Sequence, residues 1–143
     1  MSVPAAPAWA VEMLSTARVA RLATAGATGQ PLVVPVCFVL SGDRLYTAVD
    51  DKPKRTRELR RLKNIAENPA VSLVVDDWHE DWRKLRWVIV EGTAAIVEGD
   101  ERARALRALV LKYAQYATMD LERTAGAVLA IEPARVSAWR SDN

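Results

Sequence analysis

Seven of the twenty Lys and Arg residues of this chain fall within twelve consecutive positions, and cations at this density can bind a phosphorylated or otherwise anionic ligand. The segment contains a single acidic residue, Glu58, so residues 52–63 carry a net charge of +6, whereas the whole chain carries +2. The cationic site is therefore local, on a body that is mildly acidic elsewhere. The seven cations are Lys52, Lys54, Arg55, Arg57, Arg60, Arg61 and Lys63.

The first of these cations lie where a helix is predicted to begin, a position where backbone N–H groups can bind an anion. Asp50 and Asp51 can cap a helix, and Pro53 is tolerated in a first turn. Exposed cations in a first turn oppose the helix dipole at a cost of about 0.3–1 kcal/mol each, and a bound anion would reverse that cost. A solvated helix face is the alternative interpretation, and composition alone leaves both open.

Further along the same helix, the spacing of apolar residues predicts which side is buried. We expect a buried stripe at helical spacing, formed by Leu59, Leu62, Ile65 and Ala66. We expect the later cations to be mostly solvated surface, namely Arg60, Arg61 and Lys63.

Few other residues could perform catalysis or bind a metal. His79 is the only histidine and Cys37 the only cysteine, so the chain does not predict a zinc site. His79 lies in an acidic stretch that we predict to be an exposed loop, which disfavours a catalytic role. Cys37 lies inside an apolar run and is predicted to be a small core residue. The sequence therefore gives us no catalytic residue and no metal site.

Length and composition indicate one globular domain spanning residues 1–143. Half of the residues are hydrophobic and 27% are charged, as is usual for a soluble protein. The longest apolar runs are too short to span a bilayer, and residues 1–4 do not begin an export signal. We therefore expect a cytoplasmic protein that does not associate with membranes.

The hydropathy pattern predicts three helices and six strands. The expected helices cover residues 4–17, 53–67 and 101–116. The expected strands cover residues 19–24, 32–40, 44–49, 70–76 and 86–97, with a last strand region at 128–139 that bends at Pro133. Pro35 must lie at a sheet edge or a bulge, because proline cannot donate a ladder hydrogen bond. Hairpin-length connections favour an antiparallel sheet or small barrel of the α+β, mainly β class.

The order of these elements resembles the pyridoxamine 5'-phosphate oxidase-like split β-barrel superfamily. The stretch that carries the resemblance is LYTAVDDKPKRTRELRRLKNIAENPAVSLVVD at residues 45–76, followed by DWRKLRWVIVEGTA at residues 81–94. Together they resemble the small members that use coenzyme F-420, a deazaflavin with a phosphorylated polyglutamate tail. The resemblance implies a six-stranded antiparallel split β-barrel, of the FMN-binding split barrel type, with about three flanking helices.

The resemblance also implies a homodimer with two cofactor sites at the interface between the protomers. In such proteins one protomer supplies the strand before the basic helix and the start of that helix, and its first strand pair contacts the cofactor ring. The matching residues here are Val34, Pro35, Val36, Thr47, Ala48, Val49, Lys54, Arg55 and Thr56. The partner protomer supplies residues near the start of the long strand, which here match Trp82, Arg86 and Trp87.

By the same resemblance, we expect an oxidoreductase that uses coenzyme F-420 to transfer hydride to a small unsaturated organic substrate. Such a reaction needs no protein nucleophile, because the cofactor carries the chemistry. An FMN- or haem-binding protein of the same fold is one alternative, and a non-catalytic cofactor carrier is another. We do not expect a nucleic-acid partner, because aromatic residues do not interleave with the cations and no recognition motif is present.

Overall fold

The computed structural model describes the backbone of residues 3–50 and 56–141, and the side chains of residues 3–49 and 60–141. The strands are β1 (Ala20–Ala25), β2 (Pro31–Val36), β3 (Val39–Ser41), β4 (Arg44–Asp50), β5 (Ala70–Asp77), β6 (Arg86–Ile96) and β7 (Ala125–Arg140). The helices are α1 (Ala8–Thr16), α2 (Thr56–Glu67), α3 (Gly99–Lys112), α4 (Ala114–Thr118) and α5 (Leu121–Thr124), with a short 3₁₀ helix, η1 (Trp82–Lys84).

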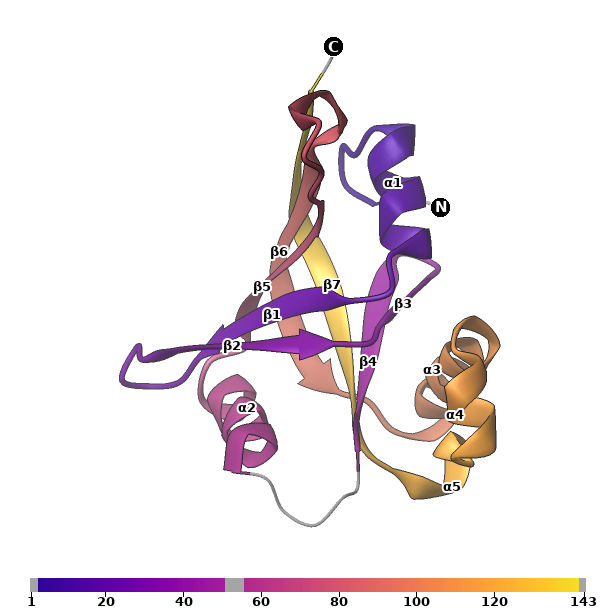
Figure 1. Cartoon of the computed structure of the whole chain (residues 1–143). Coiled ribbons are helices and arrows are strands. Elements are labelled where there is room, and N and C mark those ends of the chain that lie inside the picture. The colour runs from indigo at the N-terminus through magenta and orange to yellow at the C-terminus, as the bar shows by residue number, and fades with distance from the viewer. Residues whose placement is uncertain (1–2, 51–55, 142–143) are drawn as a thin grey trace.

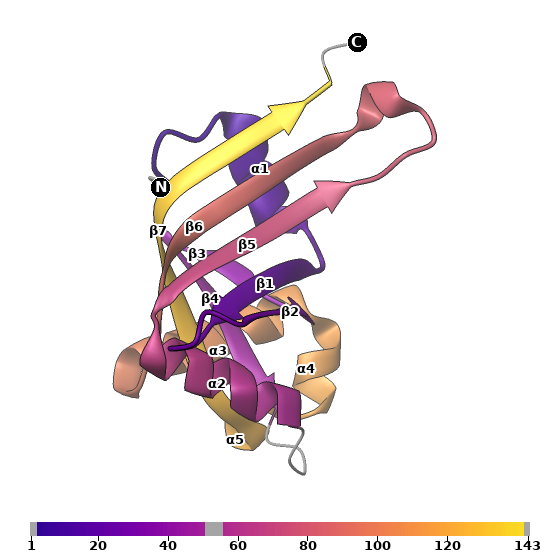
Figure 2. The same cartoon turned by 90° about the vertical axis from the view of Figure 1, so that its left-hand side faces the viewer.

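The strands form one curled antiparallel sheet in the order β2-β1-β5-β6-β7-β4-β3 (Figure 1). The sheet curls far enough to bring its two ends near each other, as a split barrel does. The chain passes from the edge strand β2 to the opposite edge strand β3 through Cys37 and Phe38. The connection between β5 and β6, which contains η1, projects from the end of the molecule away from α2 (Figure 2).

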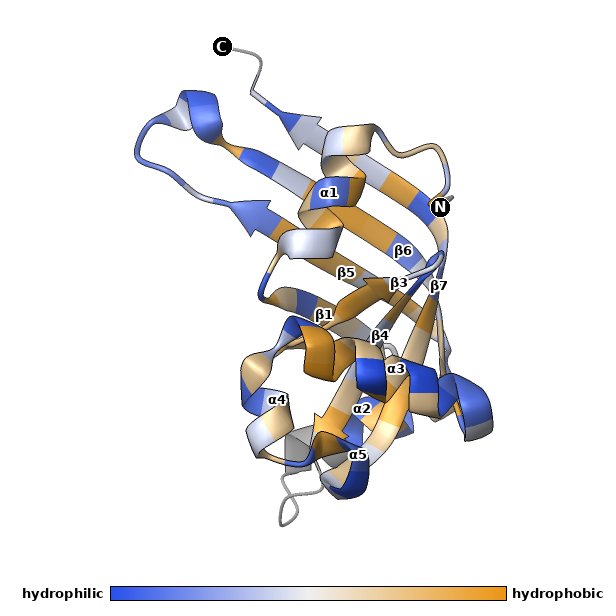
Figure 3. Ribbon diagram, turned by 90° about the vertical axis from the view of Figure 1, so that its right-hand side faces the viewer, coloured by the Kyte–Doolittle hydropathy of each residue, from blue (hydrophilic) through white to orange (hydrophobic). Residues whose placement is uncertain are grey.

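Two groups of buried apolar residues fill the fold. The larger group lies between α1 and the inner face of the sheet, and it includes Leu14, Leu22 and Val88. The second group joins α3 and α5 to β4 and β7, through residues such as Leu109, Leu121 and Val128. Figure 3 shows hydrophobic residues on the sheet where α1, α3 and α4 lie over it. α1, α3 and α4 thus lie on one side of the curled sheet, whereas α2 packs against β1 and β6.

The antiparallel architecture agrees with the prediction, but the predicted count of six strands is wrong because the described residues form seven. The predicted strand at 32–40 is interrupted at Cys37 and Phe38. Their backbone groups are bound by side chains: Cys37 O accepts from Thr47 Oγ1 at 2.7 Å, and Phe38 N donates to Tyr113 OH at 3.1 Å. Side-chain partners at these positions take the place of ladder hydrogen bonds, so the strand splits into β2 and β3. Pro35 does lie in an edge strand, as predicted.

The predicted helix count also changes, because the described residues contain five α-helices where three were expected. The expected helix at 101–116 ends at Lys112, since Tyr113 has an extended backbone with φ −119° and ψ 106°. Two short helices, α4 and α5, follow it. The bend expected at Pro133 does not end the last strand, and β7 runs without a break from Ala125 to Arg140. Among the described residues, no helix has the length and apolar character needed to cross a bilayer.

Candidate functional site

A cavity of about 210 Å³ lies where β2, β4, α2 and α4 meet. Its residues are Pro35, Val36, Cys37, Thr47, Ala48, Arg61 and Tyr116. The cavity therefore combines an apolar wall with a guanidinium, a phenol and a thiol. Four of these seven residues are among those that the resemblance implied as cofactor contacts, namely Pro35, Val36, Thr47 and Ala48.

The wall at Cys37 is held rigidly, although it belongs to the segment between two strands. Thr47 Oγ1 donates to Cys37 O, and the next carbonyl, Phe38 O, accepts from Lys112 Nζ at 2.8 Å. The ammonium of Lys112 also lies 4.1 Å from the centre of the Phe38 ring. Side chains from β4 and α3 therefore fix the strand crossing that lines the cavity. The Cys37 side chain is exposed, so the predicted core position for it is wrong.

Arg61 is a second residue of this cavity that the sequence interpretation placed incorrectly. It was expected to be solvated, but it is 7% exposed and lines the cavity. The buried face of α2 contains Arg61, Asn64 and Ile65, whereas Ala66 of the predicted stripe is exposed. The Asn64 side chain donates to Thr24 Oγ1 at 3.1 Å, and this bond fixes the rotation of α2 on β1. The rotation turns Arg61 towards β2 and β4.

The spacing of α2 contains a signal that would have identified Arg61. Residues three and four positions apart share one face of a helix, so Arg61 must lie beside Asn64 and Ile65. Because nearly every residue type that stands out in this segment is a cation, charge alone does not reveal which face of the helix Arg61 occupies. The sequence contains no comparable signal for Cys37 and Tyr116. Their positions at the cavity depend on the crossing from β2 to β3 and on the change of direction after α3.

The other predicted contacts on the same protomer have different positions. Val34 and Val49 are buried in the larger apolar core, at 7% and 6% exposed, and do not line the cavity. Thr56 begins α2, which follows β4 as expected. Lys54 and Arg55 lie outside the described residues.

Two of the residues expected to contact the cofactor of the partner protomer, Trp82 and Arg86, lie at the end of the molecule away from the cavity. Trp82 is 67% exposed in η1, and its ring lies 6.3 Å from that of Trp78. Arg86 begins β6 and its Nε is 2.6 Å from Asp77 Oδ2. Both belong to the projecting β5–β6 arm, while α2 lies at the opposite end of the sheet (Figures 1 and 2). These side chains therefore do not reach the cavity of their own chain.

Trp87 lies on the outer face of the sheet, in a second and more open cavity of about 550 Å³. The other residues of this cavity are Arg21, Val74, Asp76 and Ile89. Trp87 is directly opposite Trp139 in the β6–β7 register, and residues in such a pair share one face of the sheet. Trp139 is 45% exposed. The outer face therefore presents two tryptophans beside an Arg21–Asp76 ion pair with an N–O distance of 3.6 Å.

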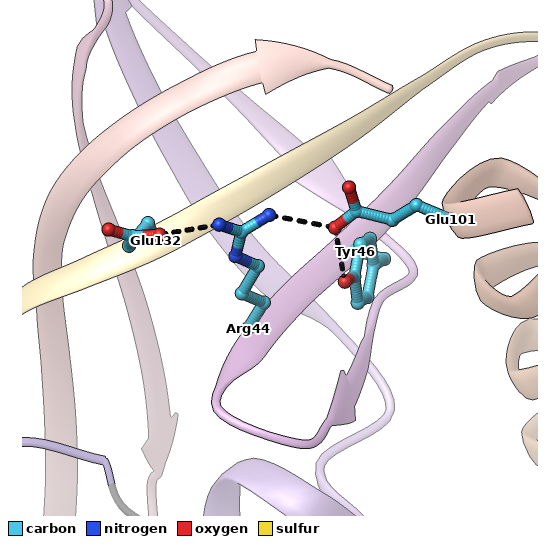
Figure 4. A network of polar contacts seen from close by, with 4 residues as sticks. All are labelled: Arg44, Tyr46, Glu101 and Glu132. Carbon is cyan, nitrogen blue, oxygen red and sulfur yellow. Dashed lines mark hydrogen bonds and ion pairs between the residues drawn. The ribbon is translucent and has the colours of Figure 1, made fainter. Parts of the chain in front are cut away.

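A polar network connects α3 to β4 and β7 (Figure 4). Glu101 Oε2 accepts from Tyr46 OH at 2.7 Å and lies 2.8 Å from Arg44 Nη1, while Arg44 Nη2 lies 2.7 Å from Glu132 Oε1. Burial, followed by the Glu101 carboxylate, raises the pKa of Tyr46 to about 12. The hydrogen bond from Tyr46 lowers the pKa of Glu101. The network braces β4, whose next two residues line the cavity.

Comparisons with known proteins agree with this fold. The family model for pyridoxamine 5'-phosphate oxidase matches residues 7–140. A 5a,11a-dehydrotetracycline/5a,11a-dehydrooxytetracycline reductase from Streptomyces rimosus is 35% identical over 85 residues. That match covers 59% of this chain and 58% of the reductase, so it extends over little more than half of either protein.

Solved structures of similar proteins cover nearly the whole chain. A conserved hypothetical protein from Mycobacterium tuberculosis superposes with a TM-score of 0.78 at 21% identity, covering 98% of this chain and 88% of the other. An FAD-binding protein from Mesorhizobium loti superposes with a TM-score of 0.65 at 26% identity, covering 90% and 87%. The first of these similarities concerns the fold alone, and the second includes a protein that is named for its flavin cofactor.

Proposed function

Because the chain belongs to the pyridoxamine 5'-phosphate oxidase family, we propose that it is an oxidoreductase that binds coenzyme F-420 and reduces a small unsaturated organic substrate. The observation that carries this proposal is the 210 Å³ cavity, which combines Pro35, Val36, Thr47 and Ala48 with the buried cation of Arg61. The similar reductase from S. rimosus supports the reaction class.

The residues around the cavity fit a planar conjugated ring with acidic or phosphorylated substituents. Pro35, Val36 and Ala48 offer apolar contacts to a ring face, and Arg61 offers planar N–H donors to carbonyl or phosphate oxygens. When bound, the deazaflavin would supply the two-electron chemistry. The chain would bind and orient it, exclude water from it, and hold the phosphorylated tail near the basic start of α2. Lys54, Arg55 and Thr56 are our proposed contacts to that tail.

We propose that two protomers form a homodimer in which each completes the partner's cofactor site. Trp82 and Arg86 lie too far from the cavity of their own chain to contribute to it (Figure 2). The exposed apolar surface at Trp87 and Trp139 would be covered by such an interface. The β5–β6 arm of one protomer would then extend towards the cavity of the other.

FMN is the second candidate cofactor, and the similarity to an FAD-binding protein favours it. FMN carries one phosphate, whereas the tail of coenzyme F-420 carries a phosphate and several carboxylates. The run of seven cations between Lys52 and Lys63 matches the longer anion better, which is why we favour the deazaflavin.

A steady-state assay tests the proposed activity. Purified protein is mixed with reduced coenzyme F-420 and a panel of conjugated enones, quinones and nitroaromatic compounds, and cofactor oxidation is followed by absorbance. We expect oxidation that depends on both protein and substrate. The proposal fails if no member of the panel accelerates oxidation of reduced coenzyme F-420 while the protein accelerates oxidation of reduced FMN by the same panel above the rate without protein.

A further inference from the structure

A third cavity of about 300 Å³ adjoins the proposed cofactor cavity. It is lined by Arg18, Cys37, Tyr113, Gln115 and Tyr116, and two of these residues, Cys37 and Tyr116, also line the cofactor cavity. A molecule in the third cavity would therefore lie next to the cofactor, at the place where the two cavities meet. Neither the family resemblance nor the predicted site residues pointed to this position.

Arg18, one of the residues that line this cavity, is held in one orientation by two contacts. Its guanidinium lies 4.4 Å from the centre of the Tyr113 ring, and its Nη1 donates to Lys112 O at 3.0 Å, at the C-terminal end of α3. A cation is stabilised at that end of a helix. Within the described chain no other hydrogen bond from this guanidinium is formed, so the rest of its N–H donors can bind a ligand.

The surroundings of Arg18 are electropositive. The ammonium of Lys112 lies 5.4 Å from the centre of the same Tyr113 ring. Burial, and then the positive charge of Arg18, lowers the pKa of Lys112 to about 8. Among the described groups that shift this pKa, none is a carboxylate. Two cations thus converge here, and among the described groups that shift this pKa only Cys37 acts against the lowering.

The remaining walls suit a flat, conjugated molecule. The rings of Tyr113 and Tyr116 are 5.5 Å apart and inclined at 67°, which gives the cavity two aromatic surfaces at an angle to each other. Gln115 adds an amide that can donate or accept a hydrogen bond. The third cavity has two aromatic walls, whereas the cofactor cavity has the Tyr116 ring alone and is otherwise lined by smaller side chains and Arg61.

We propose that the third cavity is the acceptor-substrate site, and that Arg18 selects planar conjugated substrates bearing an anionic oxygen, such as a carboxylate or an enolate. This inference rests on the proposed function, because the two cavities meet at Cys37 and Tyr116, and hydride transfer requires that the bound substrate contact the cofactor there. Arg18 acts as a specificity residue and takes no part in cofactor binding.

The test compares the binding of two probes of equal shape to protein without cofactor. The anionic probe is 2-naphthoate and the neutral probe is 2-naphthamide, and both are titrated by calorimetry at pH 7. We expect wild-type protein to bind naphthoate at least about tenfold more tightly than naphthamide, as a charge-assisted hydrogen bond requires. Arg18→Ala should abolish that preference. Arg107→Ala, which removes an exposed cation of α3, should preserve it.

Alkylation of Cys37 locates the bound probe. Cys37 is the only cysteine, is exposed and lines both cavities. Iodoacetamide labelling followed by mass spectrometry therefore reports whether a probe is bound next to it. Naphthoate should slow labelling in wild-type protein and in Arg107→Ala, and not in Arg18→Ala. Equal affinity of the two probes for wild-type protein, or naphthoate affinity unchanged in Arg18→Ala, would overturn the inference.

A separate titration distinguishes this inference from the proposed function. Arg18→Ala should bind coenzyme F-420 as tightly as wild-type protein, because Arg18 does not line the cofactor cavity. Failure of wild-type protein to bind coenzyme F-420, with naphthoate still bound through Arg18, would contradict the proposed cofactor and leave the anion-selective cavity supported. A tenfold loss of cofactor affinity in Arg18→Ala would contradict the separation of the two sites.

Discussion

Arg61 is the residue on which the proposed cofactor site depends most. It is a cation with little exposure to water, and it lies against two strands that were expected to contact the cofactor. The strand contacts Thr47 and Ala48 could be predicted, because the family resemblance implied them as residues of the strand before the basic helix. The burial of Arg61 could not be predicted from charge, because neighbouring cations in the same run lie on different sides of α2. The contrast between Arg61 and the exposed Arg60 is therefore the informative one.

Tyr46 provides a prediction about stability at the scale of one side chain. Tyr46→Phe removes the hydrogen bond to Glu101 and leaves the ring in place. We expect the free energy of unfolding to fall by about 1–2 kcal/mol, as for a partly buried hydrogen bond to a charged group. Urea denaturation measures the change. As a control, Arg123→Ala breaks an ion pair that is 78% and 58% exposed, and it should cost less than about 0.5 kcal/mol.

Lys112 predicts a pH dependence whose sign follows from its lowered pKa. The folded protein releases this proton near pH 8, whereas the unfolded chain keeps it until about pH 10.5. Between these values the unfolded state binds more protons, so the contribution of Lys112 makes stability rise with pH. Lys112→Met should reduce the rise between pH 8 and 10, measured by urea denaturation at several pH values. An identical slope in Lys112→Met and wild-type protein would show that Lys112 keeps its ordinary pKa.

At the scale of elements, the long antiparallel ladder depends on one glycine. The register between β6 and β7 shifts between Glu91 and Gly92. At Gly92 an added Cβ would overlap Glu132 O, and it would lie 2.9 Å from Glu132 C and 3.1 Å from Pro133 Cα. This close approach explains why glycine occupies the centre of the Glu-Gly-Thr-Ala segment. The neighbouring backbone cannot move aside as a flexible side chain could.

Gly92→Ala should therefore destabilise the protein strongly, by about 3 kcal/mol or more, because the two strands must separate at the bulge. Gly99→Ala is the matched control. Gly99 has φ +61° but no heavy atom within 4 Å of an added Cβ, so it should cost only about 1–2 kcal/mol of backbone strain. Denaturation of both variants gives the comparison, and equal losses would contradict the steric explanation.

Most elements could be predicted from periodicity, and the errors have local causes. β1, β5 and β6 agree with the expected segments to within two residues, since β1 and β5 have buried residues at alternate positions and β6 has a continuous apolar run. The split between β2 and β3 could not be predicted, because it depends on Thr47 and Tyr113, which lie far away in sequence. The early end of α3 also depends on residues distant in sequence. Tyr113 follows the last residue of α3, and its hydroxyl donates to Arg18 O at 2.9 Å.

At the scale of the whole molecule, the sequence predicts an antiparallel fold but not its curvature. Strand order and sheet closure come from long-range pairing, and the resemblance to a family supplied them where periodicity could not. The two cavities at α2 and α4 arise from this curvature, which brings β2 and β4 together. The projecting β5–β6 arm likewise has an exposed surface that does not pack against the core of its own chain.

The proposed homodimer predicts which surface change should separate the protomers. Trp139→Glu places a charge on the outer sheet face opposite Trp87, and it should convert the dimer to a monomer in light scattering coupled to size-exclusion chromatography. Leu111→Glu changes an 87% exposed residue of α3 and should leave the dimer intact. A monomeric wild-type protein at micromolar concentration would contradict the shared site.

The affinity for coenzyme F-420 of three proteins, measured by fluorescence titration, tests the proposed cofactor site most directly. They are the wild type, Arg61→Met and Arg60→Met, where the two variants lose the same charge from adjacent positions of α2. We expect micromolar binding for wild type and Arg60→Met, and at least about tenfold weaker binding for Arg61→Met, since only Arg61 lines the cavity. Equal affinity of the two variants, or tight binding of FMN with none of coenzyme F-420, would contradict it.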